Sequence, residues 1–225
     1  MEKLYTGKTK DVYQMDNGNI CLKFKDDVTG KDGVFDPGEN QVGLKIEGAG
    51  REALKITKFF YELLNDKGIK THYISSNIEE NTMEVKKANM FGNGLEAICR
   101  FRAVGSFIRR YGMYIEDGAP LDAYAEITLK DDERKDPLIT DEGLEMLGIL
   151  TKEEYKLIIS MTKEIAKIVK DILADKGLEL YDLKFEFARD DQGEIMLIDE
   201  ISGGSMRVYK GDQKLSPLEI HAYLI

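Results

Sequence analysis

The chain has 225 residues, of which 42 % are hydrophobic, and its 42 acidic against 32 basic side chains give a formal net charge of −10. The apolar content excludes a disordered chain. The negative charge argues against a general nucleic-acid-binding protein, because such proteins need excess positive charge to displace phosphate counterions. No apolar run reaches the roughly 20 residues that cross a bilayer, and the N-terminus has no signal-peptide pattern. We therefore expect a cytoplasmic protein without nucleic-acid or membrane partners.

The first fifty residues predict short strands and turns. Asp16-Asn17-Gly18 separates two extended runs, 12–15 and 19–25, a pattern typical of a hairpin. Six glycines between positions 30 and 50 predict loops and close turns.

The cysteines and histidines exclude two kinds of site. Cys21 and Cys99 lie far apart in apolar runs, which predicts buried thiols and no disulfide. His72 and His221 are the only histidines and have no ligand spacing, so zinc chemistry is excluded.

A helix is predicted over Arg51–Lys67, where apolar side chains recur at helical spacing and Gly68 ends the pattern. Strand character returns after it. The break at 89–94, rich in Asn and Gly, predicts a boundary between an N-terminal lobe, 1–90, and a C-terminal lobe, 91–225.

In the second half, 95–101 is expected to form a buried strand and Ser106–Tyr111 a short helix. Thr151–Lys176 carries the clearest helical pattern, because a capping box precedes a broad apolar stripe. The segments 183–187 and 195–201 are expected to form a hairpin.

That C-terminal hairpin carries the strongest local indication of chemistry. With a loop at Asp190–Gly193, positions that sum to 383 face each other, so Lys184 is expected opposite Asp199, with Glu186 diagonal to Asp199 on the same face. Two carboxylates beside a lysine suit a magnesium ion that carries a nucleotide phosphate. Glu200 is expected on the other face, in a structural or supporting role. A solvated face with a cross-strand ion pair would show the same spacing.

Three further segments could bind charged ligands. Gly7-Lys8-Thr9-Lys10 could hold ATP phosphates as point charges, although it lacks P-loop spacing and surface lysines would look the same. Arg100 to Ser106, followed by Arg109 and Arg110, could cradle a phosphate at a helix start, or form an ordinary cationic helix face. The mixed-charge loop 130–139 could bind a zwitterion or complete a metal shell, or be a hydrated surface loop.

The order of these motifs resembles the SAICAR synthetase family of purine biosynthesis over about Leu4 to Tyr209. The segments that carry the resemblance are Gly7-Lys8-Thr9-Lys10-Asp11-Val12-Tyr13, Arg100-x-Arg102-Ala103-x-Gly105-Ser106, Lys130-x-Asp132-x-x-x-Asp136-Pro137-Leu138-Ile139, Asp182-x-Lys184-x-Glu186-Phe187, and Asp199-Glu200-Ile201-Ser202 through Arg207.

The resemblance implies an α+β, two-lobed fold related to ATP-grasp enzymes and protein kinases, with a mainly antiparallel N-terminal lobe and a larger α+β C-terminal lobe. It also implies a ligase that uses ATP and Mg²⁺ to join the carboxylate of a phosphoribosyl-aminoimidazole carboxylate, CAIR, to the amine of L-aspartate through an acyl phosphate. A homodimer is a further expectation from the family.

The resemblance assigns roles residue by residue. Expected to hold ATP are Lys8, Lys10, Lys184 and, on the adenine side, Glu96. Magnesium would bind Glu186 and Asp199. The ribose 5′-phosphate would bind Arg100, Ser106 and Arg207. The reacting carboxylate and the amino acid would lie near Lys130, Asp132 and Asp136.

Several positions depart from the family pattern. The family's Lys-Gly stretch and paired asparagines correspond to Ala49 and Ala53-Leu54, its Arg-Asn to Arg100-Phe101, and its Pro-Asp to Gly203-Gly204. The C-terminal helix is also expected to be short. Three hypotheses follow: SAICAR synthetase activity, a paralogous ligase acting on a related phosphorylated carboxylate, and a nucleotide-binding regulator without turnover.

Overall fold

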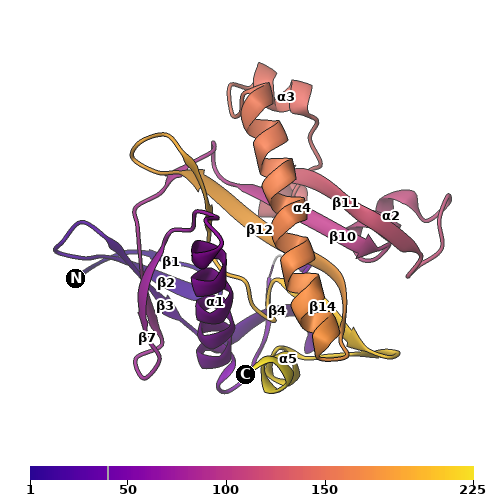
Figure 1. Cartoon of the computed structure of the whole chain (residues 1–225), viewed down its shortest axis with the longest axis horizontal. Coiled ribbons are helices and arrows are strands. Elements are labelled where there is room, and N and C mark those ends of the chain that lie inside the picture. Colours follow the sequence, from indigo (N-terminus) through magenta and orange to yellow (C-terminus); the bar gives the residue numbers. More distant parts are fainter. Residues whose placement is uncertain (40) are drawn as a thin grey trace.

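The computed structural model describes residues 1–39 and 41–225, and antiparallel sheets dominate it (Figure 1). The N-terminal part forms a five-stranded sheet, and most later strands form a seven-stranded sheet. In spatial order, the five-stranded sheet contains β1 (Glu2–Thr6), β2 (Lys10–Gln14), β3 (Ile20–Phe24), β8 (Thr82–Val85) and β7 (Tyr73–Asn77). A three-stranded sheet contains β5 (Val34–Phe35), β4 (Asp27–Lys31) and β6 (Val42–Lys45).

The seven-stranded sheet forms the framework of the C-terminal part. Its main path runs through β11 (Pro120–Leu129), β10 (Leu95–Arg102), β12 (Glu179–Arg189), β14 (Met206–Lys210) and β15 (Gln213–Lys214), with β9 (Asn89–Met90) and β13 (Ile195–Ile198) paired to β12. The helices of the described residues are α1 (Ala49–Asp66), α2 (Ser106–Tyr111), α3 (Asp141–Met146), α4 (Lys152–Asp175), α5 (Pro217–Leu224) and the 3₁₀ turn η1 (Asp132–Arg134). Within the described ranges, no helix is long and apolar enough to span a membrane.

The locally encoded elements lie where the sequence predicts them. The Asp16-Asn17-Gly18 turn joins β2 and β3, and Gly18 has a φ of 87°. α2 has the predicted bounds, and α4 begins with the predicted capping box at Thr151. α1 begins two residues earlier than predicted, after Gly48 in the left-handed region, and ends just before Gly68 at a φ of 80°.

Strand alternation separates the two faces of the seven-stranded sheet. One face is apolar and packs under α4, which contacts β10, β11 and β12. Its buried side chains include Ala97, Cys99, Leu183, Phe185 and Phe187. Because neighbours along a strand point to opposite faces, the intervening residues lie on the other face, and most of these are charged: Glu96, Arg100, Asp182, Lys184 and Glu186.

The predicted register of the C-terminal hairpin is wrong by one residue. Glu186 pairs with Ile198, so facing positions sum to 384, and Lys184 does not face Asp199. The turn closes with the Asp190 amide donating to the Glu194 carbonyl, which leaves a three-residue loop with Gly193 at a φ of 83°. Three-residue loops with a left-handed residue are a common hairpin class, and the expected four-residue loop shifts the sum by one.

Candidate active site

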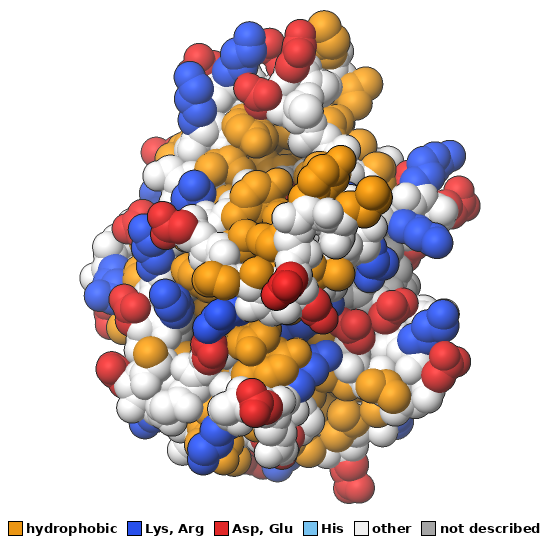
Figure 2. Space-filling model, turned by 90° about the vertical axis from the view of Figure 1, so that its right-hand side faces the viewer, with side chains coloured by type: hydrophobic (Ala, Val, Ile, Leu, Met, Phe, Trp, Pro, Cys, Tyr) orange, Lys and Arg blue, Asp and Glu red, His pale blue; other side chains and the backbone are white. Residues whose placement is uncertain are grey.

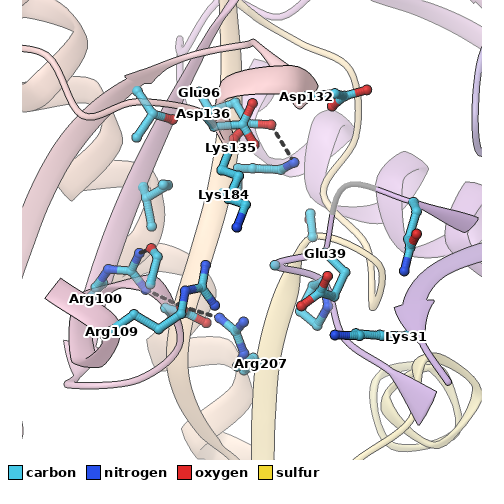
Figure 3. Close-up of a pocket in the computed structure, with 18 residues that line it drawn as sticks. Lys31, Glu39, Glu96, Arg100, Arg109, Asp132, Lys135, Asp136, Lys184 and Arg207 are labelled. Carbon is cyan, nitrogen blue, oxygen red and sulfur yellow. Dashed lines mark hydrogen bonds and ion pairs between the residues drawn. The ribbon is translucent and has the colours of Figure 1, made fainter. Parts of the chain in front are cut away.

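A cavity of about 670 Å³ lies over the charged face of the seven-stranded sheet (Figure 3). β10 contributes Glu96 and Arg100 to its lining, and β12 contributes Asp182 and Lys184. Residues near the three-stranded sheet, Lys31, Gly38 and Glu39 among them, line the opposite wall. The loop around η1 adds Asp132, Lys135 and Asp136. The cavity therefore has charged walls supplied by both halves of the chain.

Lysines and carboxylates alternate at one end of this region, which we call the lysine end and define as Lys10, Lys130, Lys184, Glu96, Glu186, Asp199 and Glu200. The Lys130 ammonium lies 2.6 Å from Glu186, and the Lys184 ammonium lies 2.7 Å from Glu96. The Lys10 ammonium lies 3.1 Å from Asp199 and also donates to Glu200. Glu200 therefore shares Lys10 with Asp199 and is not turned away from this cluster as expected, and its supporting role stays a prediction.

The two expected metal ligands, Glu186 and Asp199, are close to each other, but strand alternation does not explain how Asp199 reaches this position. β13 ends at Ile198, and Asp199 has a φ of 67°, which breaks the alternation. Burial and the negative charge of Asp199 raise the pKa of Glu186. Burial also opposes ionisation of Asp199, but the charges of Lys10 and Lys130 outweigh it and hold that pKa below its usual value. The two carboxylates therefore influence each other electrostatically, and their role as metal ligands stays a prediction.

The donor set at this pair suits a magnesium ion bound together with a phosphate. Magnesium is usually held by one or two carboxylates plus phosphate oxygens and water. Glu186 and Asp199 supply two such carboxylates. Among residues 1–39 and 41–225, no group of three or more His, Cys, Asp or Glu side chains forms a metal-binding cluster.

The loop that carries Asp199 is held from behind by α1 and the segment before β7. The Tyr61 hydroxyl donates to the Ile198 carbonyl at 2.8 Å, and the Thr57 hydroxyl lies 3.2 Å from the Ile201 carbonyl. The backbone amide of His72 donates to the Leu197 carbonyl. Burial and the charge of Asp199 hold the pKa of Tyr61 well above its usual value, so the phenol stays protonated and able to donate.

The other end of the region is built from arginines, and we define this arginine end as Arg100, Arg110, Arg207, Asp36, Glu126 and Asp182. One oxygen of Asp182 accepts from Arg100 and from Arg207, both at 2.6 Å. Arg100 also binds Glu126 at 3.0 Å, and Arg207 binds Asp36 at 2.7 Å. The predicted phosphate-binding residues therefore gather here, although each arginine already has carboxylate partners.

Two glycines leave room for the Arg207 guanidinium. A Cβ at Gly38 would lie 2.5 Å from its Nη2, and a Cβ at Gly105 would lie 2.9 Å from the same atom. Gly105 also has a φ of 59°, which L side chains rarely adopt. The backbone at both positions therefore approaches the guanidinium more closely than any other residue would allow.

The predicted group Lys130, Asp132 and Asp136 makes three separate sets of contacts. Lys130 pairs with Glu186, whereas Asp132 lies at the exposed rim and binds Lys8 at 2.7 Å. Asp136 accepts from the Asp131 amide at 2.8 Å. Lys8 therefore lies apart from Lys10 and joins the N-terminal sheet to the rim of the cavity.

The structure places Glu96 in the cavity wall, and its adenine-side role stays a prediction. It is buried on β10, binds Lys184 and lines the cavity beside Arg100.

Sequence analysis did not single out Asp36, Tyr61, Glu126 or Asp182 as site residues. The sequence does contain a signal for Asp182, because it lies two residues before Lys184 and four before Glu186 and so shares their charged face. Asp36 gives no local signal.

Several of the departures from the family pattern lie together, whereas Phe101 lies apart on β10. Ala49, Ala53 and Gly204 line one small pocket with Glu200 and with Pro217 of α5. A Cβ at Gly203 would lie 2.5 Å from the Pro217 Cα, so α5 occupies space that a larger residue would need. The short C-terminal helix and the small residues are thus parts of one local arrangement.

The fold and the cavity define an α+β protein with a charged small-molecule site bordered by separate antiparallel sheets. The sequence profile described as SAICAR synthetase matches residues 3–218. A phosphoribosylaminoimidazole-succinocarboxamide synthase of Clostridium tetani is 60 % identical to this chain, and the alignment covers 100 % of both. One of the same name from Aquifex aeolicus is 35 % identical over 93 % of this chain and 92 % of its own. The chain therefore belongs to the SAICAR synthetase family.

Solved structures agree with this assignment. One described as SAICAR synthetase (Type-2) in complex with ADP has a TM-score of 0.83 at 31 % identity, covering 96 % of this chain and 93 % of that one. The phosphoribosylaminoimidazole-succinocarboxamide synthase of Ehrlichia chaffeensis has a TM-score of 0.86 at 28 % identity, covering 98 % and 95 %. The expected family and α+β fold are confirmed.

Proposed function

We propose that this protein is an ATP-dependent C–N ligase that joins CAIR to L-aspartate and forms SAICAR in purine biosynthesis. Sequence identity of 60 % to a relative of that name supports the reaction, and the ADP complex of a structural neighbour supports nucleotide binding. The observation that carries the proposal is the pairing of two carboxylates, the buried Glu186 and the partly buried Asp199, with Lys10 and Lys130 beside a cavity that also contains an arginine end.

The lysine end supplies what phosphoryl transfer needs. Lys10 and Lys184 would neutralise the charge on ATP phosphates, and Lys8 at the rim would contact the nucleotide from the N-terminal side. Glu186 and Asp199 would hold Mg²⁺, which when bound neutralises charge on the transferring phosphoryl group. The γ-phosphoryl group passes to a carboxylate oxygen of CAIR, and ADP leaves.

The second step forms the amide. The aspartate amine attacks the activated carbonyl carbon, the C–O bond to phosphate breaks, and the amine loses a proton as inorganic phosphate leaves. Lys130, Asp132 and Asp136 would orient the acyl phosphate and the amino acid. Positioning and charge neutralisation provide most of the acceleration that such a step requires.

The arginine end would receive the ribose 5′-phosphate. Ser106 lies at the start of α2, its hydroxyl accepts from Arg100 at 2.8 Å, and it lines the cavity together with Arg207. These contacts support the expected substrate-binding roles of Arg100, Ser106 and Arg207. A cytoplasmic location and the division at residue 90 form part of the same proposal, and the homodimer stays a prediction.

The test is product formation by the purified protein. Mg-ATP, CAIR and L-aspartate are incubated with the enzyme, ADP release is followed, and SAICAR is identified by mass. We expect turnover that requires all three substrates. ATP binding without SAICAR would overturn the proposal.

A second candidate is a paralogous ligase on a related phosphorylated carboxylate. The small residues at Ala49, Ala53 and Gly204 favour it, because they line one pocket beside Glu200 where the family pattern has polar side chains. A screen of other phosphorylated carboxylates and amines, with ADP release as the signal, separates it from the first.

A further inference from the structure

The part of the proposed site that would receive the amino acid needs a cation that has not yet been named. L-Aspartate carries two carboxylates, both ionised at neutral pH, beside the amine that reacts. The loop expected near it supplies the carboxylates Asp132 and Asp136, which suit an ammonium group, and Lys130, which is bound to Glu186 at 2.6 Å. A carboxylate that leaves water needs an opposite charge. The amino acid therefore requires a further cation at this place.

The lysines at the cavity differ in whether they already have a carboxylate partner. Lys184 lines the cavity and binds Glu96 at 2.7 Å. At the rim, Lys8 binds Asp132 at 2.7 Å. Lys135 also lines the cavity and is exposed, and within the described part of the chain it has no carboxylate partner. Its ammonium group is therefore available to a ligand.

The loop that carries Lys135 has a fixed and unusual backbone. Lys135 has a φ of 59° and Asp136 a φ of 48°, values that residues other than glycine adopt at a cost in free energy. The Asp131 amide donates to the Asp136 carboxylate at 2.8 Å, and the Asp136 amide donates to the Asp131 carbonyl at 3.0 Å. These two reciprocal bonds hold the strained conformation. Strain that is held in this way at a cavity wall points to a role for the side chain presented there.

Two other cations provide a comparison with Lys135. Arg134 directly precedes it, but the Arg134 guanidinium binds Asp131 of the same loop at 2.8 Å. Lys31 ends β4 and lines the opposite wall. Figure 3 shows Lys135 in the same part of the cavity as Asp136, with Lys31 across from them. Lys135 therefore combines a place on the cavity wall with an ammonium group that has no carboxylate partner among the described residues.

We propose that Lys135 binds a carboxylate of the amino-acid substrate. This inference rests on the proposed function, because it specifies how that site recognises L-aspartate. Asp132 and Asp136 would attract the ammonium end of the free amino acid, and Lys135 of the same loop attracts its negative end. One loop thus offers both signs of charge to a zwitterion. Lys135 is a binding residue, so its loss should appear in the KM for the amino acid.

Steady-state kinetics with each substrate varied in turn tests this role. Wild type is compared with Lys135→Met, which keeps the length of the side chain and removes its charge, and with Lys135→Arg, which keeps the charge. Arg134→Met removes the neighbouring cation of the loop, and Lys31→Met removes the cation of the opposite wall. Thermal unfolding of each variant shows whether it is folded.

We expect Lys135→Met to raise the KM for L-aspartate by about 10- to 100-fold, while the KM values for CAIR and Mg-ATP change little. Lys135→Arg should retain most of the affinity for L-aspartate. Arg134→Met should stay within about twofold of wild type, as is usual for an exposed charge. An unchanged KM for L-aspartate in Lys135→Met, or equal rises for all three substrates, would overturn the inference. So would a rise specific to L-aspartate in Lys31→Met in place of Lys135→Met.

A binding measurement keeps this test separate from the test of the reaction. L-Aspartate is titrated calorimetrically, in the presence of Mg-ADP, into wild type, Lys135→Met and Arg134→Met. Binding that is weaker by at least about tenfold in Lys135→Met alone supports the inference even if no SAICAR is formed. Equal binding by all three proteins, or no binding by wild type, contradicts it even if SAICAR is formed.

Discussion

The lysine end and the arginine end pair opposite charges in different ways. At the lysine end, flexible ammonium groups contact single carboxylate oxygens, and burial together with the charge of Asp199 raises the pKa of Glu186. At the arginine end, planar guanidinium groups share carboxylates, and Asp182 joins Arg100 to Arg207. The lysine end suits ligands that bind and leave during a reaction, because an ammonium group is a point charge on a flexible stem and does not require one binding geometry. The arginine end suits a binding site whose geometry stays fixed, because its planar guanidinium groups share the same carboxylates.

The surface of the protein differs from both ends of the cavity in how its charges are distributed. Figure 2 shows apolar side chains interspersed among charged ones on one face of the molecule, so charge is mixed there and not collected into one basic patch. Strong local charge is instead concentrated in buried clusters such as Lys10 with Glu200 and Arg100 with Asp182. An overall negative protein can thus bind anions without an extended basic surface.

The strongest test of the lysine end is Asp199→Asn. The amide keeps the size of the side chain but removes one of two charges expected to hold Mg²⁺, so we expect kcat to fall by about 10³-fold. Steady-state ADP release at saturating Mg-ATP measures it. Asp191→Asn in the exposed hairpin turn is the control. A loss below tenfold would show that Asp199 is not a metal ligand.

The arginine end should respond in stability. Asp182→Asn removes the charge shared by two buried guanidinium groups, and we expect the free energy of unfolding to fall by about 3 kcal/mol. Asp36→Asn, with a side chain one-third exposed, should cost about 1 kcal/mol. Urea unfolding monitored by circular dichroism measures both. Equal effects would mean that Asp182 does not organise the network.

A pH effect on stability is expected beside the lysine end. Burial lowers the pKa of His72 from 6.5 to about 4, against the opposing attraction of Asp199. Between these values the unfolded state binds a proton that the folded state does not, so stability rises with pH from about 4 to 6.5 and is lost as pH falls. The shift corresponds to about 3 kcal/mol. Urea unfolding across this range should show a flatter profile for His72→Phe, while His221→Gln should keep the His72 contribution.

The smallest expected effect concerns the support of the Asp199 loop. Tyr61→Phe removes the hydrogen bond to the Ile198 carbonyl, and we expect a loss of about 1 kcal/mol in stability with roughly a tenfold rise in the Mg²⁺ concentration needed for half-maximal rate. Tyr73→Phe removes a neighbouring hydroxyl that binds Glu62 and Ser76 instead. If both variants behave alike, the Tyr61 contact does not position Asp199.

The sequence predicts those parts of the structure that local chemistry determines. The capping box at Thr151, the Asn-Gly turn and the glycine after α1 each determine an element through neighbouring residues, and all are found. The prediction of the hairpin register is wrong because three- and four-residue turns have similar sequences. The approach of Asp199 to Glu186 was expected from alternation, but it depends on a left-handed backbone at a non-glycine residue.

The arginine network could not be predicted because its partners are far apart in the chain. Arg100 follows from one motif, yet its carboxylate partner Glu126 lies on another strand, β11. Asp36, which binds Arg207, directly follows β5. Charged residues at these positions are compatible with an exposed surface until the sheet brings them together.

Groups that meet at the cavity lie far apart along the chain, and this separation affects the order in which the protein folds. Lys10 and Glu200 are 190 positions apart, and Asp36 and Arg207 are 171 apart. Contacts between residues so far apart in sequence form late, because the entropy cost of closing the long loop precedes any stabilisation from the contact. We therefore expect α4 and the short hairpins to gain protection from hydrogen exchange early in refolding. Ligand binding should appear only in the final cooperative phase, when the ends of the chain meet.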